Sequence, residues 1–207
     1  MPVGLVLGMD GAGKTTLLRQ LSHSYRDAKH SKLVSVLDMV RSRLFVPTDD
    51  KTPKFLDHIT TVPTTGLEEE SIVHRDMHLT LREVGAPMLS MWSAYYDGCD
   101  FYVFLVDMAN IPQLGAAAIE FFNVVQAMET KAGFLVFNKC DAPCSASVQW
   151  VRSLFCLDQL STSSNMNILQ VSAARGLHLD TLVDAIVNKL SRPNNRQFVQ
   201  TRIHPTN

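Results

Sequence analysis

Hydrophobic residues are grouped along the chain in short uninterrupted runs rather than in strict alternation with polar residues. Four such runs occupy residues 3–7, 101–106, 134–137 and 168–171. Runs of this length without alternation are typical of strands that are buried on both faces of a parallel sheet. The pattern therefore predicts four buried strands.

Between these runs, hydrophobic residues recur every three or four positions, which is the period of an amphipathic helix. Four stripes share this spacing: Leu17, Leu18, Leu21 and Tyr25; Leu114, Ala117, Ala118, Phe121, Phe122 and Val125; Val148, Val151, Leu154 and Phe155; and Leu179, Leu182, Val183, Ile186 and Leu190. Pro112 suits the first turn of the second helix, and Pro193 ends the fourth. Alternating strands and helices predict an α/β fold, a doubly wound sheet with helices on both faces.

Three segments depart from this alternation. Residues 67–74 and 77–84 are predicted to form a hairpin, and three consecutive glutamates in it suit a solvated edge strand. The tail from residue 191 to 207 is polar, and we expect it to be loose. Residues 27–60 are polar and charged. Within them, the spacing of one amphipathic helix is found at Leu33, Val36, Leu37, Val40 and Leu44.

Composition limits the class of protein. The 207 residues suffice for one good core, and 46% hydrophobic and 19% charged residues are usual for a globular protein. A net charge of -1 gives no electrostatic argument for nucleic acid or an anionic membrane as partner. No apolar run could span a bilayer, and the N-terminus lacks a secretory signal. We expect a monomeric cytoplasmic protein with free thiols.

The segment GMDGAGKTT, residues 8–16, matches the phosphate-loop spacing G-x-x-x-x-G-K-[ST] between a predicted strand and a predicted helix. Glycines allow backbone N–H groups to face phosphate oxygens at the helix N-terminus. Lys14 is expected to bridge the terminal phosphates, and the Thr15 hydroxyl to ligate Mg²⁺. A dinucleotide fingerprint fails because Thr16 stands where it needs glycine. Candidate nucleotide-binding residues here are Gly8, Asp10, Gly11, Ala12, Gly13, Lys14, Thr15 and Thr16.

The segment FNKCD ends at Asp141, directly after a predicted buried strand. The Asp141 carboxylate can accept hydrogen bonds from the ring N–H and the exocyclic amine of guanine, a donor pair that adenine lacks. Lys139 would lie along the base with its alkyl stem, while Asn138 ties the loop to the phosphate side. This position at a strand end is where α/β folds place ligand contacts. The segment therefore predicts a guanine site.

A third segment, VSAARG, follows the last predicted strand. Ser172 would brace the loop, and a backbone N–H near Ala173 or Ala174 would donate to the guanine O6. Alone, the segment would be read as a plain strand-to-helix loop. As the third motif in order, it favours a bound nucleotide.

These residues resemble the Ras-like small GTPases, and within them the ADP-ribosylation factor (Arf) branch. GMDGAGKTT is similar to the Arf phosphate loop, including Asp10. TVPTTG at residues 61–66 resembles the first switch, where the Mg²⁺-sensing threonine falls on Thr64. REVGAP at residues 82–87 takes the place of the second-switch motif W-D-V-G-G-Q.

The resemblance implies the P-loop small-GTPase fold, a six-stranded, mostly parallel sheet with one antiparallel edge strand and helices on both faces. It implies one G domain over residues 1–191, with an insertion at about 27–58 before the first switch, and a flexible tail at 192–207. GTP or GDP would be the ligand and Mg²⁺ the metal, held by Thr15 and Thr64.

Departures from the Arf pattern lie in the second switch. The aspartate that holds Mg²⁺ through water is Glu83 here, and Gly85, whose N–H would meet the γ-phosphate, is kept. With Lys14, Gly85 is the catalytic candidate. The water-positioning glutamine is replaced by Pro87, which has neither a polar side chain nor a backbone N–H. We expect slow hydrolysis, because catalysis in this class is mostly positioning, unless a partner supplies an arginine.

The resemblance also implies effectors, an exchange factor and an activating protein that bind the switch regions. Of the aromatic trio on which Arf effectors dock, Tyr95 is kept, whereas Leu67 and Arg82 replace the others. Pro2 stands where Arf proteins carry the myristoylated glycine, and IHPTN is no prenylation box. No autonomous membrane anchor is therefore expected, and association with cilium or Golgi would occur through partners.

Two functions from different classes stay open, and a third is disfavoured. The first is a GTP-binding switch with slow or partner-dependent hydrolysis, acting in vesicle or ciliary traffic. The second is a scaffold that holds GTP with negligible hydrolysis, and Pro87 is the residue that favours it. A P-loop ATPase or kinase is disfavoured, because residues 138–141 would then have no role.

Overall fold

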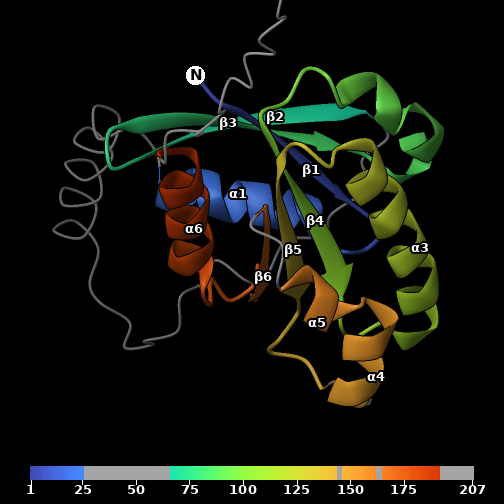
Figure 1. Cartoon of the computed structure of the whole chain (residues 1–207). Helices are drawn as coiled ribbons and strands as arrows, with labels where there is room; N and C mark the ends of the chain where they lie inside the picture. Colours follow the sequence, from blue (N-terminus) through green and yellow to red (C-terminus); the bar gives the residue numbers. More distant parts are fainter. Residues whose placement is uncertain (26–65, 144–145, 162–164, 192–207) are drawn as a thin grey trace, which may run out of the picture.

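The computed structural model describes residues 1–25, 66–143, 146–161 and 165–191 (Figure 1). Within these residues one sheet runs in the order β2-β3-β1-β4-β5-β6. Its strands are β1 (Val3–Gly8), β2 (Leu67–His74), β3 (Met77–Val84), β4 (Phe101–Asp107), β5 (Ala132–Asn138) and β6 (Met166–Gln170). Neighbouring strands are parallel except for the antiparallel pair β2 and β3. The predicted six-stranded, mostly parallel sheet is confirmed.

Helices cover both faces of this sheet (Figure 1). The described helices are α1 (Lys14–Ser24), α3 (Ile111–Ala127), α4 (Val148–Leu154), α5 (Leu157–Leu160), α6 (Leu179–Ser191) and the 3₁₀ helix η1 (Ala86–Tyr95). One core layer joins α1 and α6 to the sheet, and the other joins η1, α3, α4 and α5 to the opposite face. The predicted α/β architecture with helices on both faces is therefore confirmed.

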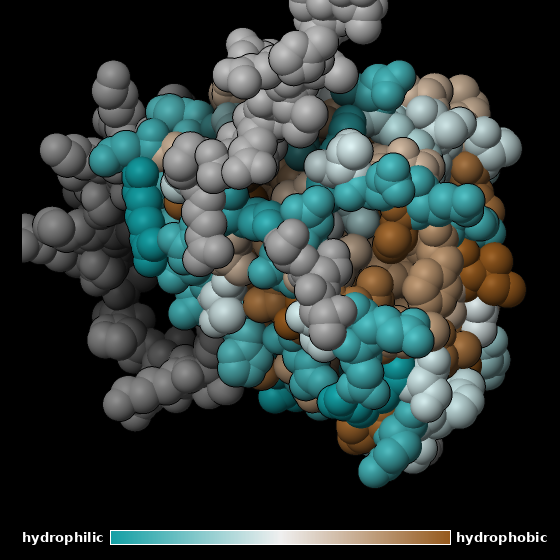
Figure 2. Space-filling model, in the orientation of Figure 1, coloured by the Kyte–Doolittle hydropathy of each residue, from teal (hydrophilic) through white to brown (hydrophobic). Residues whose placement is uncertain are grey.

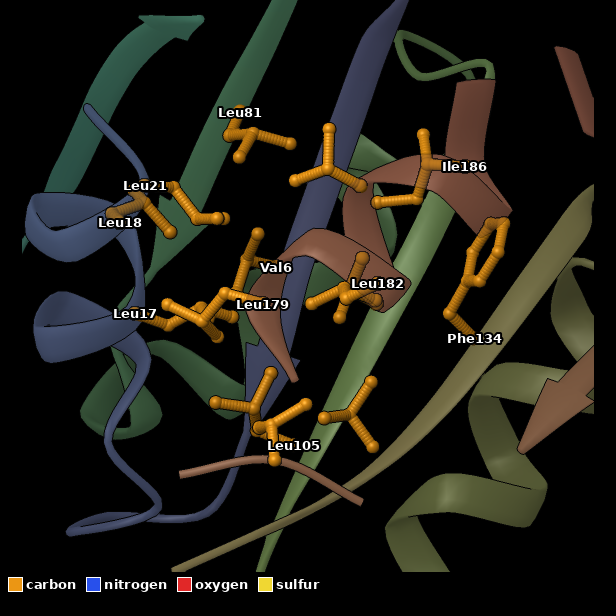
Figure 3. Close-up of a cluster of buried hydrophobic side chains, with 14 of the residues drawn as sticks. Val6, Leu17, Leu18, Leu21, Leu81, Leu105, Phe134, Leu179, Leu182 and Ile186 are labelled. Carbon is orange, nitrogen blue, oxygen red and sulfur yellow. The ribbon is translucent and has the colours of Figure 1, made fainter. Parts of the chain in front are cut away.

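The first core layer is apolar throughout (Figure 3). Leucines of α1 and α6 meet the aliphatic and aromatic side chains of the central strands. Burial of each such side chain stabilises the fold by about 1.5–3 kcal/mol. The side chains labelled in this layer are Val6, Leu17, Leu18, Leu21, Leu81, Leu105, Phe134, Leu179, Leu182 and Ile186.

Aromatic rings fill the second layer. Trp92 of η1 is 1% exposed and packs edge-on against Phe104 of β4, with ring centroids 6.3 Å apart. Phe121 of α3 also packs edge-on against Phe104, with ring centroids 5.4 Å apart. Trp92 is thus a core residue, whereas Tyr95 at the end of the same helix is half-buried. Apolar side chains also gather on the surface over α3 (Figure 2), where Ile119 is exposed.

The hairpin of β2 and β3 begins and ends where the sequence predicts. Arg75 and Asp76 form its turn with φ angles of 47° and 63°, the left-handed conformation of a tight hairpin turn. The tip is fastened to α6, because the Asp184 carboxylate lies 2.6 Å from His74 Nε2 and 2.9 Å from Arg75 Nη2. At the edge, Arg82 pairs with Glu69. The acidic edge strand is therefore solvated and paired, as expected.

Two expectations about burial are wrong. The run at residues 168–171 lies mainly in β6, which is half-buried because it forms the edge of the sheet beside β5. Val148 begins α4 and is 70% exposed, whereas Val151 of the same stripe is buried.

The expected insertion at 27–58 and the tail at 192–207 lie outside the described residues. None of the described helices is long and apolar enough to cross a bilayer.

Candidate functional site

The loop between β1 and α1 depends on three glycines with positive φ. Gly8, Gly11 and Gly13 have φ angles of 149°, 72° and 91°. A Cβ at Gly8 would lie 2.5 Å from the carbonyl oxygen of Leu105, and one at Gly13 would lie 2.4 Å from Asn138 Nδ2. Two of these positions therefore exclude a side chain sterically as well as conformationally.

Lys14 folds back over this loop. Its ammonium donates to the carbonyl oxygens of Gly8 at 2.9 Å and Met9 at 3.1 Å. Burial lowers the pKa of Lys14, although the negative charges of Glu83 and Asp10 act against this shift. A buried ammonium that is paired with carbonyl dipoles gains a stronger partner when an anionic phosphate enters the loop.

Thr15 and Glu83 form the oxygen pair that a metal would use. The Thr15 hydroxyl donates to Glu83 Oε1 at 2.9 Å, and both side chains are buried. Hydroxyl and carboxylate oxygens suit Mg²⁺, which is commonly held by one or two protein ligands together with phosphates and water. The described residues gather no group of three or more His, Cys, Asp or Glu, and such a Mg²⁺ site does not require one. Thr64 lies outside the described residues.

Asn138 joins the three predicted segments. Its side chain is 2% exposed, and its Nδ2 donates to the carbonyl oxygen of Ala12 at 2.8 Å. Its Oδ1 accepts the backbone N–H of Ala173 at 2.9 Å. Of the two N–H groups that the sequence offers to the guanine O6, that of Ala173 is thus bonded to Asn138, and the other belongs to exposed Ala174. One amide side chain connects the ends of β1, β5 and β6.

Lys139 is held by a residue that sequence reasoning missed. Lys139 has a φ angle of 64°, and its Nζ lies 2.6 Å from Asp107 Oδ2. The Asp107 side chain is 5% exposed at the end of β4. The only available signal was an acidic residue that closes the apolar run FYVFLV.

The neighbours of Asp141 favour the ionised form of its carboxylate. A hydrogen bond from the Ser172 hydroxyl holds the pKa of Asp141 below its usual value, and Arg175 acts in the same direction. Arg175 Nε lies 3.3 Å from Asp141 Oδ2, and the backbone N–H of Arg175 donates to Ser172 Oγ at 3.1 Å. Sequence reasoning missed Arg175, which is separated from Asp141 by a whole helix–strand unit. An ionised carboxylate is the form that can accept two N–H groups.

Gly85 of the second switch is bonded both to the end of the first-switch segment and to the 3₁₀ helix that follows it. The backbone N–H of Gly85 donates to Gly66 at 3.2 Å, and the Gly85 carbonyl accepts Trp92 Nε1 at 3.2 Å. Pro87 is exposed in the first turn of η1, which begins at Ala86. The Gly85 N–H must leave Gly66 before it can donate to a phosphate.

The three candidate partner residues differ in accessibility. Leu67 is exposed and Tyr95 is half-buried, while the Arg82 guanidinium is paired with Glu69 at 2.6 Å. Leu67 begins β2 and Tyr95 ends η1, so these side chains border the hairpin and the second switch. The surface they offer is mixed rather than uniformly aromatic.

The sheet order, the glycine loop at residues 8–16 and the Asn138 amide that connects it to residues 138–141, here called the base loop, match the P-loop small-GTPase fold. The model of the ADP-ribosylation factor family matches residues 52–190, and the chain belongs to that family. The predicted resemblance is thereby confirmed.

Relatives agree with this membership. The chain is 30% identical over 180 residues to ADP-ribosylation factor-like protein 16 of Homo sapiens, covering 84% of this chain and 79% of the human protein. It is 25% identical over 190 residues to ADP-ribosylation factor-like protein 1 of Drosophila melanogaster, covering 90% and 87%. The Arl6 BBS3 small GTPase from Trypanosoma brucei, solved with the nucleotide analogue GppNp, has a TM-score of 0.66 at 18% identity. That likeness covers 92% of this chain and 98% of the solved chain, and it shows the fold.

Proposed function

We propose that this chain is a guanine-nucleotide switch that binds GTP and GDP with Mg²⁺. The observation that carries the proposal is the Asn138 amide, which fixes the base loop to the phosphate loop and to the loop after β6. A nucleotide has a base at one end and phosphates at the other, so its site needs two loops at a fixed separation. A single buried side chain that bonds both loops supplies that separation.

The base would be read by Asp141 and the phosphates by Lys14. Asp141 accepts the two N–H groups of guanine, while Ser172 keeps its carboxylate ionised. A site built on such a donor pair rejects a ligand that lacks it by a large factor. Thr15 and Glu83 would hold Mg²⁺, with Thr64 as the further ligand that the family pattern implies. When bound, Mg²⁺ neutralises charge between the β- and γ-phosphates.

The switch would respond to the γ-phosphate through Gly85. Its N–H is bonded to Gly66, at the start of the hairpin, so a phosphate that captures this N–H releases the Gly66 carbonyl. That exchange of acceptors links the nucleotide state to the edge of the sheet where Leu67 and Arg82 lie. Order in a switch segment that depends on the γ-phosphate is a recurring form of such transitions.

Hydrolysis would be slow without a partner. Pro87 occupies the place of the water-positioning glutamine, and its ring offers no hydrogen-bonding group. Pro87 also lies in the first turn of η1, and Trp92 of the same helix bonds to the Gly85 carbonyl that precedes it. A second function is favoured by the same residue: a GTP-binding scaffold that does not turn over.

Base selectivity tests the proposal directly. With Mg²⁺ present, we expect fluorescent GDP to bind far more tightly than fluorescent ADP, and Asp141→Asn to move the preference toward the xanthine nucleotide. Xanthine carries a carbonyl where guanine carries the amine, so an amide donor suits it better. Asp158→Asn is the matched control, because that carboxylate is 73% exposed in an ion pair of α5. Equal affinity of the parent for GDP and ADP would contradict the proposal.

Single-turnover hydrolysis separates the switch from the scaffold. We expect a slow rate in the parent and a rate about tenfold higher or more in Pro87→Gln, because positioning supplies most of the catalysis. Pro112→Gln, at an exposed proline in the first turn of α3, controls for the loss of a proline. If GTP stays intact in the parent even with cell extract, the scaffold is the correct function. A fast parent rate would show that Pro87 does not limit hydrolysis.

Partners and pathway follow from the surface and the family. Effectors would contact the switch regions around Leu67, Arg82 and Tyr95, and these residues differ enough from the Arf trio to select other partners. Action in vesicle or ciliary traffic is the accompanying proposal. It is tested by identifying the proteins that bind the GTP-loaded form and not the GDP-loaded form.

A further inference from the structure

We propose that Asp107 is a positioning residue of the guanine site, which acts by fixing the Lys139 side chain along the base. This inference deepens the proposed function and rests on it. It concerns a residue of β4, which lies outside the phosphate loop, the base loop and the switches.

The Asp107 carboxylate is buried and uses both of its oxygens. Oδ2 lies 2.6 Å from Lys139 Nζ, and Oδ1 accepts the backbone N–H of Ala109 at 2.9 Å. The second bond orients the carboxylate within its own turn. Asp107 also pairs in register with Asn138 at the ends of β4 and β5. The anchor of the lysine is therefore itself rigid.

The backbone of Lys139 is held on both sides. The Asn138 carbonyl accepts the N–H of Met108 at 3.2 Å, and the Cys140 N–H donates to Val171 at 3.1 Å. Between these two bonds, Lys139 has the left-handed φ angle of 64°, which is unfavourable for a residue with a Cβ. The residue before Lys139 is thus bonded to the segment after β4, and the residue after Lys139 is bonded to the segment after β6.

The lysine side chain would be loose without its ion pair. It is 37% exposed, and a lysine has many rotamers to lose when it is ordered. The ion pair at Asp141 differs, because Arg175 is 63% exposed and solvent weakens such a contact. The buried Asp107 carboxylate is a fixed end point for the ammonium. With Nζ held there, the alkyl stem spans the distance from the base loop to β4 and forms one wall for the purine.

The test measures release of fluorescent GDP from the full-length protein with Mg²⁺. Asp107→Asn keeps the shape and one acceptor but removes the charge, and we expect GDP to dissociate about tenfold faster. Asp158→Asn removes an exposed carboxylate of the same type and should leave the rate unchanged. A rate in Asp107→Asn equal to that of the parent would overturn the proposal.

A double-mutant cycle separates positioning from general support of the fold. Lys139→Met keeps most of the alkyl stem and removes the ammonium, so it should also speed release about tenfold. In the Lys139→Met background, Asp107→Asn should add no further acceleration, because the carboxylate acts only through the ammonium. If Asp107→Asn speeds release equally in both backgrounds, Asp107 supports only the turn at Ala109 and the proposal is wrong.

These measurements distinguish failure of the proposed function from failure of the role of Asp107. Lys139→Met leaves Asp107 in place, so an unchanged rate in that variant overturns the proposal even if Asp107→Asn does not fold. If the parent itself does not prefer GDP to ADP, the proposed function fails, and the positioning role of Asp107 fails with it. If the parent prefers GDP but the two variants release it at the parent's rate, only the role of Asp107 is overturned.

Discussion

Replacement of Asn138 by alanine is expected to loosen the site even when no nucleotide is present. The substitution removes both partners at once: the donor to Ala12 at 2.8 Å and the acceptor of the Ala173 N–H at 2.9 Å. Both contacts are buried, so neither backbone group regains a water molecule easily. Leaving a buried group unsatisfied costs about 1–3 kcal/mol.

Two such groups give a loss of about 2–6 kcal/mol, and we take about 3 kcal/mol because the loops can partly relax. For a chain of this size, each kcal/mol lowers the melting temperature by about 2–4 °C, so the expected fall is about 6–12 °C. Urea unfolding of the nucleotide-free protein measures the free energy directly. The buried indole of Trp92 reports the transition, and the slope with urea should stay the same.

Asn123→Ala is the matched control for this substitution. Asn123 lies on α3, and its amide bonds only to Glu120 at an exposed site among the contacts described. Its removal should change the free energy of unfolding by less than about 0.5 kcal/mol. A loss below about 1 kcal/mol in Asn138→Ala would refute the view that this amide ties the loops together.

Three further substitutions and titrations test other contacts. The Ser172 hydroxyl lowers the pKa of Asp141 in the folded protein, so Ser172→Ala should raise that pKa. As the pH is lowered, GDP affinity should therefore begin to fall at a higher pH in the variant than in the parent. Loss of GDP affinity at the same pH in both proteins would contradict this. Gly133→Ala would place a Cβ 2.6 Å from the Tyr102 hydroxyl and should cost about 1–3 kcal/mol in urea unfolding, whereas Gly115→Ala, in open space on α3, should be neutral or stabilising. Burial raises the pKa of Tyr102 to about 12, so the stability that its protonated form supplies should be complete below the ordinary tyrosine pKa of about 10 and should be lost as the pH rises from there through about 12; ionisation of Tyr102 near pH 10, followed by ultraviolet absorbance, would contradict this.

The fold was largely predictable because hydrophobic period reports burial. The unbroken runs at residues 3–7 and 101–106 lie in strands with neighbours on both sides, and the hairpin follows from its alternation. The run at 168–171 has the same apolar pattern but lies mainly in β6, at the edge of the sheet. An apolar run does not show whether a strand has a neighbour on one side or on both, so this difference could not be predicted. The 3₁₀ helix from Ala86 was missed because its pattern has no 3.6-residue period.

Candidate site residues could be predicted where the proposed chemistry needs a fixed spacing along the chain. Lys14 and Asp141 belong to segments whose spacing is set by phosphate and base. Asp107 and Arg175 touch those segments from elsewhere in the sequence, and only the register of the strands brings them together. The contacts of Asp107 and Arg175 therefore depend on the folded sheet, and no motif in the sequence indicates them.

The two bonds of Asn138 also set when the site can come into existence. They join positions 126 and 35 residues apart along the chain, so the first cannot form until β1 lies in the sheet with β5, and the second cannot form until β6 has docked beside β5. Nucleotide binding would therefore require β1, β5 and β6 to be in place together, and a bound nucleotide would stabilise that arrangement by mass action. A fragment that lacks either end of the chain would be expected to lose the pocket entirely, however intact its remaining motifs.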